Sequence, residues 1–190
     1  MTASTGRWSA AEVCVEIAGP QRWMDLRDLR LRALSDSPDA FGQTYEVERA
    51  RPDAVWRSRL EQPGRPVLLA WVGTVPPSAP TGHGRRPAAM AILARPHSSA
   101  GRPDLDGVTG VYSVYVDRWA RGRGVGTALL SAAIAHARAA GVTRLVLNVG
   151  DHNLAAQALY RRVGFEPTGR LGSLPPPRQH VTEHELALDL

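Results

Sequence analysis

Hydrophobic and polar residues alternate along several short stretches of the chain. The clearest alternation covers Val108–Val116, which is also rich in β-branched and aromatic residues and predicts a strand. Other alternating or continuous apolar runs predict strands at Ala11–Ile17, Val67–Val72, Leu145–Val149, Phe165–Thr168 and Glu183–Leu188. Ala88–Ala94 fits either a strand or a short helix. The pattern therefore predicts a sheet as the centre of the fold.

Apolar residues spaced three or four positions apart predict the helices. Trp23–Leu34 has this spacing at Leu26, at Leu29 or Arg30, and at Ala33 or Leu34, as an amphipathic helix does. Further helices are predicted at Tyr45–Leu60, Thr127–Ala140 (before Gly141) and Leu154–Val163 (between Asn153 as its cap and Gly164). The predicted order is β-α-α-β-β-β-α-β-α-β-β, a mixed α/β domain.

The length of 190 residues is typical of one domain. Residues 1–10 predict a flexible leader, and residues 11–190 the domain itself. Gly73–Pro87 and His97–Gly107 are rich in Gly, Pro and charged residues, so we expect exposed loops there.

Composition excludes several classes of protein. The net charge is +5 and all 23 basic residues are arginines, but they are spread along the chain, so we expect no nucleic-acid partner. No apolar run approaches the ~20 residues of a membrane span, and the first residues lack the apolar middle of a secretory signal. One cysteine, Cys14, and six histidines without ligand spacing predict no disulfide framework and no metal. We expect a cytoplasmic protein with no membrane partner.

The segment Arg121–Gly126 (RGRGVG) lies between a predicted strand and a predicted helix. Glycines there let a ligand approach the backbone, and the helix N-terminus favours a phosphate. A tight turn that needs glycine is the alternative. A Walker loop is excluded because the chain has no lysine. A dinucleotide loop is a weaker alternative, because Thr127 stands where the third glycine belongs, although Asp151 could imitate the acid that binds the ribose.

These residues together resemble the GNAT family of acetyl-CoA-dependent N-acetyltransferases. The resemblance rests on the strand ending VYSVYV, on Arg121-x-x-Gly124-x-Gly126, and on Asn153 followed by Tyr160-x-x-x-Gly164-Phe165. The segment Leu29–Tyr45 also looks like the first helix and loop of bacterial members. The resemblance covers about residues 11–190 and implies a single domain around a splayed central sheet, with a possible homodimer through the last strands.

The resemblance implies acetyl-CoA as cosubstrate and a direct attack by the acceptor amine. Backbone groups of Val114, Tyr115 and Val116 would pair with the pantetheine arm, and an N–H near Val116 would stabilise the oxyanion. Asn153 would contact the cofactor arm, and Tyr160 would protonate the departing thiolate. The pyrophosphate would be held by the N–H groups of Arg121, Gly122, Arg123, Gly124, Val125, Gly126 and Thr127. Ordinary alternatives are a core tyrosine at Tyr160 and a simple helix cap at Asn153.

The central strand departs from the family pattern, because no carboxylate lies between Val108 and Val116 to act as general base. The sequence leaves water and five carboxylates as candidates: Glu46, Asp106, Asp117, Glu183 and Glu185.

We expect an N-acetyltransferase that acts on a primary amine of a small molecule. A protein N-terminus or lysine is the alternative acceptor, and a CoA-binding module without catalysis is the alternative of another class. The expected acceptor loops, Ser35–Thr44, His97–Gly107 and Leu171–His180, signal no charge preference.

Overall fold

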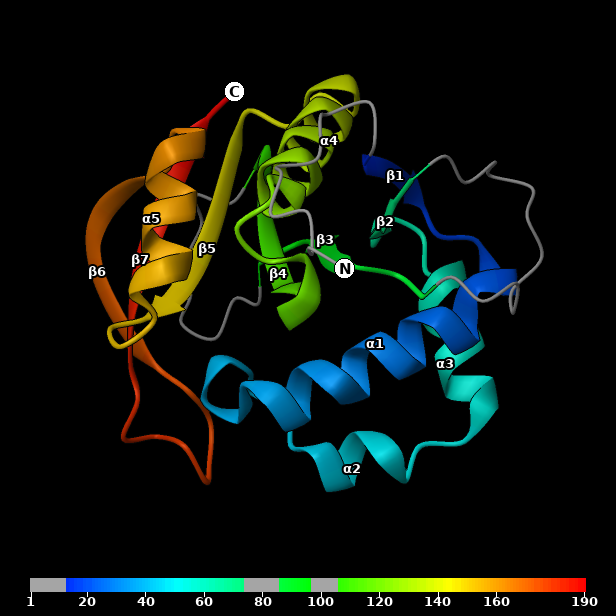
Figure 1. The fold of residues 1–190 in the computed structure, drawn as a ribbon. Helices are drawn as coiled ribbons and strands as arrows, with labels where there is room; N and C mark the ends of the chain where they lie inside the picture. The colour runs from blue at the N-terminus through cyan, green and yellow to red at the C-terminus, as the bar shows by residue number, and fades with distance from the viewer. Residues whose placement is uncertain (1–12, 74–85, 97–105) are drawn as a thin grey trace, which may run out of the picture.

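The computed structural model describes residues 13–73, 86–96 and 106–190, and in it seven strands form one mixed sheet (Figure 1). Across the sheet the order is β1-β2-β3-β4-β5-β7-β6. Neighbouring strands are antiparallel except β4 and β5, which are parallel. The strands are β1 (Val13–Ile17), β2 (Val67–Val72), β3 (Ala89–Ala94), β4 (Val108–Val116), β5 (Arg144–Gly150), β6 (Glu166–Ser173) and β7 (Thr182–Asp189).

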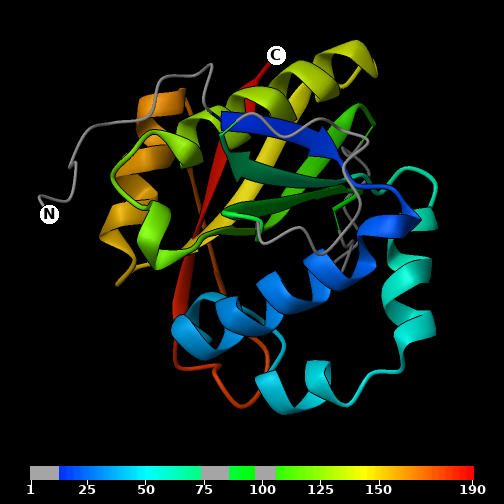
Figure 2. The same ribbon diagram turned by 45° about the vertical axis from the view of Figure 1, so that its right-hand side comes forward.

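Helices cover both faces of this sheet. One face carries α1 (Trp23–Asp36), α2 (Tyr45–Arg49) and α3 (Asp53–Glu61). The other carries α4 (Val125–Ala139) and α5 (Leu154–Val163), as Figure 2 shows. The mixed α/β fold predicted from the sequence is therefore confirmed. No helix in the described ranges is long and apolar enough to cross a membrane.

Alternation along the strands divides the core between the two faces. In β2, Leu68 and Ala70 pack in the cluster that contains the apolar residues of α4 and α5. Their neighbours Leu69 and Trp71 pack in the cluster formed with α1 and α3. Successive side chains of a strand point to opposite faces, so a continuous apolar run is what a strand buried on both sides requires.

The predicted helix Tyr45–Leu60 was wrong, because the structure breaks it into α2 and α3. The break lies at Pro52, which has φ −61° and ψ 152° and stands just before α3. Proline disfavours the helical conformation at the residue before it and has no N–H for an intrahelical bond. The ambiguous segment Ala88–Ala94 contains the strand β3, and β6 extends beyond the predicted Phe165–Thr168 to Ser173.

Some predictions concern residues outside the described ranges. The leader at 1–10 lies there, as do residues 74–85 and 97–105, which form most of the two predicted loops.

The sheet splits between β4 and β5. These strands pair only at Val108–Gly110 and Arg144–Val146, whereas β5 stays paired with β7 along its whole length. Beyond Gly110, β4 stays with β3, and the register shifts between Met90 and Ile92. The extra residue lies on β4, where Ser113 and Val114 stand against Ala91 alone, and Ser113 has φ +53°. A bulge bends its strand and increases the local twist, so β4 is turned away from β5 and a gap opens in the sheet.

Candidate active site

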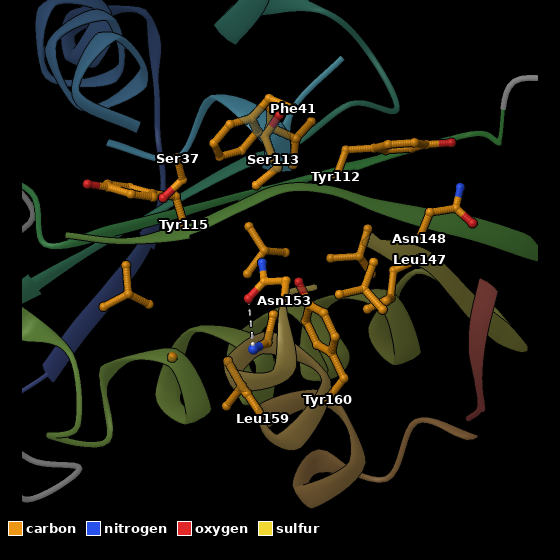
Figure 3. A pocket seen from close by; sticks show the side chains of 18 of the residues that line it. Ser37, Phe41, Tyr112, Ser113, Tyr115, Leu147, Asn148, Asn153, Leu159 and Tyr160 are labelled. Carbon is orange, nitrogen blue, oxygen red and sulfur yellow. Dashed lines mark hydrogen bonds between the residues drawn. The ribbon is translucent and has the colours of Figure 1, made fainter. Parts of the chain in front are cut away.

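The gap between β4 and β5 opens into a cavity of about 1800 Å³. One side of the cavity is formed by the start of α4 and by α5, including Gly124, Asn153 and Tyr160. The other side is formed by α1, the loop after it and α3, including Arg30 and Phe41. Figure 3 shows Asn153 and Tyr160 below β4, with Ser113 and Phe41 above it. The cavity thus connects the two faces of the sheet.

The glycine loop leads into the first amides of α4, which have no partner within the helix. Gly122 and Gly124 have φ +72° and +88°, a conformation that side chains other than glycine rarely adopt. The N–H of Ala128 donates to the carbonyl of Gly124 (3.0 Å). The amides of Val125–Thr127 therefore precede the first i→i−4 bond of the helix and are available to an anion. These features fit the pyrophosphate of a CoA molecule.

Gly126 has a packing role that the sequence did not indicate. A Cβ at this position would lie 2.8 Å from Cδ2 of Leu159 on α5 and 3.4 Å from Cγ2 of Val116 on β4. The missing side chain therefore lets α4 approach α5 and the central strand closely. Gly126 serves this contact as well as the loop.

The side chain of Arg121 is tied to neighbouring parts of the protein. Its Nε donates to the carbonyl of Val116 (2.9 Å), and its guanidinium pairs with Asp36 at the end of α1. Tyr115 lies beneath it, 5.6 Å from the ring centroid to Cζ, and donates to the same carboxylate (3.3 Å). The N–H of Arg121 donates to the carbonyl of Arg118 (3.3 Å). Arg121 anchors the loop, and Arg123 is not among the residues that line the cavity.

Asn153, the cap of α5, and Tyr160 within α5 both line the cavity. Oδ1 of Asn153 accepts from the N–H of Ala156 (3.2 Å), so the predicted helix cap is confirmed. Gln157 donates through Nε2 to the carbonyls of Gly150 (3.2 Å) and Asp151 (3.0 Å), which holds the turn between β5 and α5. The capping of α5 thus positions Asn153 at the mouth of the gap.

Tyr160 lies further along α5 and is 6% exposed. Its ring packs edge-to-face on Phe165, with centroids 6.1 Å apart. Its carbonyl accepts from the N–H groups of Gly164 and Phe165 at the left-handed end of the helix. Within the described ranges, the hydroxyl has no hydrogen-bond partner. Burial raises the pKa of Tyr160 well above its usual range, so the hydroxyl stays protonated and can donate.

The opposite side of the cavity depends on Arg178, which the sequence analysis did not identify. Arg178 follows three prolines between β6 and β7 and is 8% exposed. Its guanidinium donates to the carbonyl of Phe41 (2.7 Å and 3.1 Å) and to that of Gln43 (2.8 Å). The residue therefore joins the loop after α1 to the loop between β6 and β7. An arginine after prolines carries no signal of such a contact.

A buried ionic cluster lies beside this loop, and the sequence analysis missed it as well. Glu48 is 2% exposed and accepts two hydrogen bonds from Arg59 (2.8 Å and 3.2 Å). Arg51 also pairs with it (3.2 Å), and Nη2 of Arg30 lies 4.0 Å from its carboxylate. Burial, opposed in part by Glu48, lowers the pKa of Arg30 to about 10, with the nearby charges of Arg59, Arg65 and Arg178 adding to the effect. The one feature of the sequence that could have indicated this cluster is the position of Arg30 on the apolar face of its predicted helix.

The candidate carboxylates fall into two groups. Asp106, Asp117 and Glu46 are not among the residues lining the cavity, and Asp117 pairs with Arg32 (2.9 Å). Glu183 and Glu185 on β7 both line it.

The two candidate bases that line the cavity have different surroundings. Glu185 accepts from the hydroxyl of Thr168 (3.0 Å). The carboxylate of Glu183 has no hydrogen bond or ion pair within the described ranges, and burial raises its pKa above the usual value of a glutamate. No group of three or more His, Cys, Asp or Glu in the described part of the chain could hold a metal ion.

Comparison with known proteins identifies the family to which this split mixed sheet belongs. The model of the acetyltransferase (GNAT) family matches residues 43–165. YncA of Salmonella typhimurium, solved with its cofactor acetyl-CoA, superimposes with a TM-score of 0.69 over 94% of each chain at 18% identity. The chain belongs to the GNAT family of acetyltransferases. The family resemblance seen in the sequence is confirmed.

Two kinds of named relative are similar to the chain in sequence. An L-methionine sulfoximine/L-methionine sulfone acetyltransferase from Pseudomonas aeruginosa is 31% identical over 140 residues, which are 70% of this chain and 72% of that protein. A mycothiol acetyltransferase from Salinispora arenicola is 35% identical over 138 residues, 72% of this chain and 39% of that protein. The chain thus spans only 21% to 39% of the length of the mycothiol acetyltransferases it matches.

Proposed function

We propose that this protein transfers an acetyl group from acetyl-CoA to a primary amine of a small molecule. The observation that carries the proposal is the cavity through the split sheet, with a helix-terminal anion site at one side and a protonated tyrosine beside the gap. The named relatives support a small acceptor, since one is named for L-methionine sulfoximine and L-methionine sulfone and the other for mycothiol, all of which are small molecules.

The residues of the chain fit acetyl-CoA in the following way. The free amides at the start of α4 bind the pyrophosphate, and the open edge of β4 at Val114–Val116 pairs with the pantetheine arm. Asn153 borders the same arm. When bound, acetyl-CoA supplies an acyl group activated as a thioester. The chain contributes the orientation of both partners in the gap, which converts an encounter in solution into a reaction within one complex.

Two side chains move protons in this proposal. The hydroxyl of Tyr160 donates to the sulfur of CoA as it leaves, because burial keeps that hydroxyl neutral. Glu183 accepts the proton that the acceptor ammonium must lose before attack. Of the two candidate bases on β7 that line the cavity, it is the one whose carboxylate has no polar partner within the described residues, and burial raises its pKa towards that of the amine.

Free thiol release tests the proposal. The protein is incubated with acetyl-CoA and, in separate reactions, with small primary amines, with peptides that have a free N-terminus and with lysine peptides. The proposal expects thiol release with small amines and none above background with peptides. Release with peptides alone would support a protein acceptor instead.

Ligand-induced thermal stabilisation separates the remaining alternatives. The proposal expects acetyl-CoA and CoA to raise the Tm, and NAD or NADP to leave it unchanged. Stabilisation by CoA without turnover on any amine would indicate a CoA-binding module. Stabilisation by NAD or NADP alone would indicate a dinucleotide-binding protein.

A further inference from the structure

Three arginines line the acceptor side of the cavity close to one another. Arg30 comes from α1, Arg59 from α3, and Arg65 precedes β2. The buried carboxylate of Glu48 lies among them and is already held by Arg59 (2.8 Å) and Arg51 (3.2 Å). Positive charge therefore exceeds negative charge at this end of the cavity.

Arg30 is the buried member of these three arginines, and it is only loosely paired. It is 7% exposed, yet its nearest carboxylate oxygen, on Glu48, lies 4.0 Å from Nη2. Even with its pKa lowered to about 10, the guanidinium is charged at neutral pH. A buried charge is costly unless it is closely paired and hydrogen-bonded. The site is therefore suited to an anion that reaches it through the cavity.

The guanidinium of Arg30 is held at the wall of the gap. Its Cζ lies 4.7 Å from the centroid of the Phe41 ring, and Nη1 donates to the hydroxyl of Ser113 (3.3 Å). Ser113 belongs to the bulge of β4, beyond the last residue that pairs with β5. Figure 3 shows Phe41 and Ser113 together on this side of the strand. An anion at Arg30 therefore lies next to the gap.

Further hydrogen-bond donors lie at the same end of the cavity as Arg30. Trp56 lines the cavity, is fully buried, and its indole N–H has no acceptor within the described ranges. Arg65 is partly buried beside Arg59 and donates through Nη1 to the side chain of Gln62 (3.0 Å). A planar guanidinium suits the two oxygens of a carboxylate. The donors outnumber the acceptors, which fits a ligand that brings acceptors.

We propose that Arg30, with Arg59 and Arg65, forms an anion subsite for the acceptor. The acceptor is accordingly a small molecule that carries a carboxylate beside its primary amine, as an α-amino acid does. The inference rests on the proposed acetyl transfer and names its substrate class. In an α-amino acid one carbon separates the two groups, so a carboxylate at Arg30 places the amine at the β4 bulge. Glu183 faces the same cavity from β7 and takes the ammonium proton.

Matched acceptors test the subsite on the whole protein. A panel of α-amino acids is compared with the corresponding α-amides, which keep the amine and lose the carboxylate charge. For accepted amino acids we expect kcat/KM to exceed that of the amide by about 10- to 100-fold, the range of a hydrogen bond to a charged group. Arg30→Gln should remove most of this preference through KM, whereas the amide should change less than threefold. Arg30→Lys should restore part of it.

Arg49→Gln is the matched control, because it removes the same charge from an exposed position on α2 outside the cavity. We expect the control to keep the preference. Equal kcat/KM for amino acids and amides in the wild type would overturn the proposal. An equal loss on both acceptors in Arg30→Gln would do the same, because it would indicate a structural role.

Calorimetry measures ligand binding at the subsite without the need for turnover. The protein is loaded with CoA and titrated with N-acetyl amino acids and with their amides, and Arg30→Gln should weaken binding of the carboxylate form alone by at least about tenfold. If no amine is acetylated but this selective loss is seen, the acetyl-transfer proposal fails and the subsite stands. If amines are acetylated and both forms bind equally, the subsite fails and acetyl transfer stands.

Discussion

At the scale of single residues, the hydroxyl of Tyr160 is the group whose role can be isolated most cleanly. Tyr160→Phe keeps the ring and its edge-to-face contact with Phe165. A thiolate with a pKa near ~8.5 is already a tolerable leaving group, so the acid helps without being indispensable. We expect kcat to fall by about 10²- to 10³-fold, the lower half of the range for general acid catalysis, with little change in acetyl-CoA affinity.

Steady-state kinetics on an accepted amine measures this loss, and calorimetry with acetyl-CoA measures the affinity. Tyr45→Phe is the control, because Tyr45 is 36% exposed on α2 and is not among the cavity-lining residues. A kcat within twofold of wild type, with chemistry limiting the rate, would show that Tyr160 is a packing residue.

Glu183 leads to a prediction about pH. A base works only when deprotonated, so the rate should fall as pH drops through the pKa of Glu183. Since burial raises that pKa, the fall should lie at higher pH than for an exposed glutamate. Glu183→Gln should lower kcat/KM by at least about 100-fold and remove this acid limb.

The pH dependence of kcat/KM tests the assignment, with Glu185→Gln as the control on the same face of β7. Its carboxylate accepts from Thr168 (3.0 Å), so we expect the acid limb to persist in that variant. An unchanged limb in Glu183→Gln would assign the proton to another group or to water.

At the scale of elements, the contact between α4 and α5 depends on the size of residue 126. Gly126→Val places methyl groups where even a Cβ would lie 2.8 Å from Leu159. We expect a loss of about 1–3 kcal/mol in the free energy of unfolding, as for other overpacked contacts. Leu159→Ala in the same chain should recover part of this loss, because it makes room for the added group.

Denaturant unfolding of the two single variants and the double variant measures this coupling. Gly172→Val is the control, because a Cβ on Gly172 would meet no atom within 4 Å. Purely additive losses would mean that the two side chains do not compete for one space.

Several elements could be predicted from the sequence to the residue, and others could not. The strands Val67–Val72 and Val108–Val116 and the helix Leu154–Val163 have the predicted bounds, because their periodicity and caps are local. The break at Pro52 was missed, because the prediction of one helix over Tyr45–Leu60 did not take the proline into account. Of the candidate site, the sequence predicted the part that lies in two local motifs, namely the glycine loop Arg121–Gly126 and the helix from Asn153 to Tyr160.

The remaining part of the site depends on contacts between distant residues. Glu183 and Glu185 are two residues apart on a strand, so the sequence gives them the same face and no order of preference. Only the packing of β6, which brings Thr168 to Glu185, separates them. Arg178 and the cluster around Glu48 were missed for the same reason, since their partners lie on other elements.

At the scale of the whole molecule, Arg178 joins two segments that are 137 residues apart in the chain. Arg178→Met keeps an unbranched side chain but removes the guanidinium N–H groups. The carbonyls of Phe41 and Gln43 then lose the hydrogen bonds that Arg178 donates to them. The loop that carries Phe41 should then become mobile. We expect the acceptor KM to rise by about tenfold, the size of one or two hydrogen bonds, with acetyl-CoA affinity unchanged.

Kinetics on Arg178→Met measures the acceptor KM, and calorimetry measures the affinity for acetyl-CoA. Arg138→Met is the control, because Arg138 lies at an exposed position of α4. A parallel loss of acetyl-CoA affinity would mean that Arg178 supports the whole cavity rather than its acceptor side.

The departure of β5 from β4 after Gly110 also gives the sheet an edge in its interior. An open edge normally invites a strand from another chain, and proteins protect such edges with covering elements. Here α1 and α5 lie on either side of the open edge of β4, and Arg30 of α1 and Tyr160 of α5 line the cavity that leads to it. A second protein chain therefore meets helices before it meets the edge, whereas a thin, extended molecule with amide groups can enter and pair with β4. The same helices thus shape the cavity and guard the sheet against aggregation.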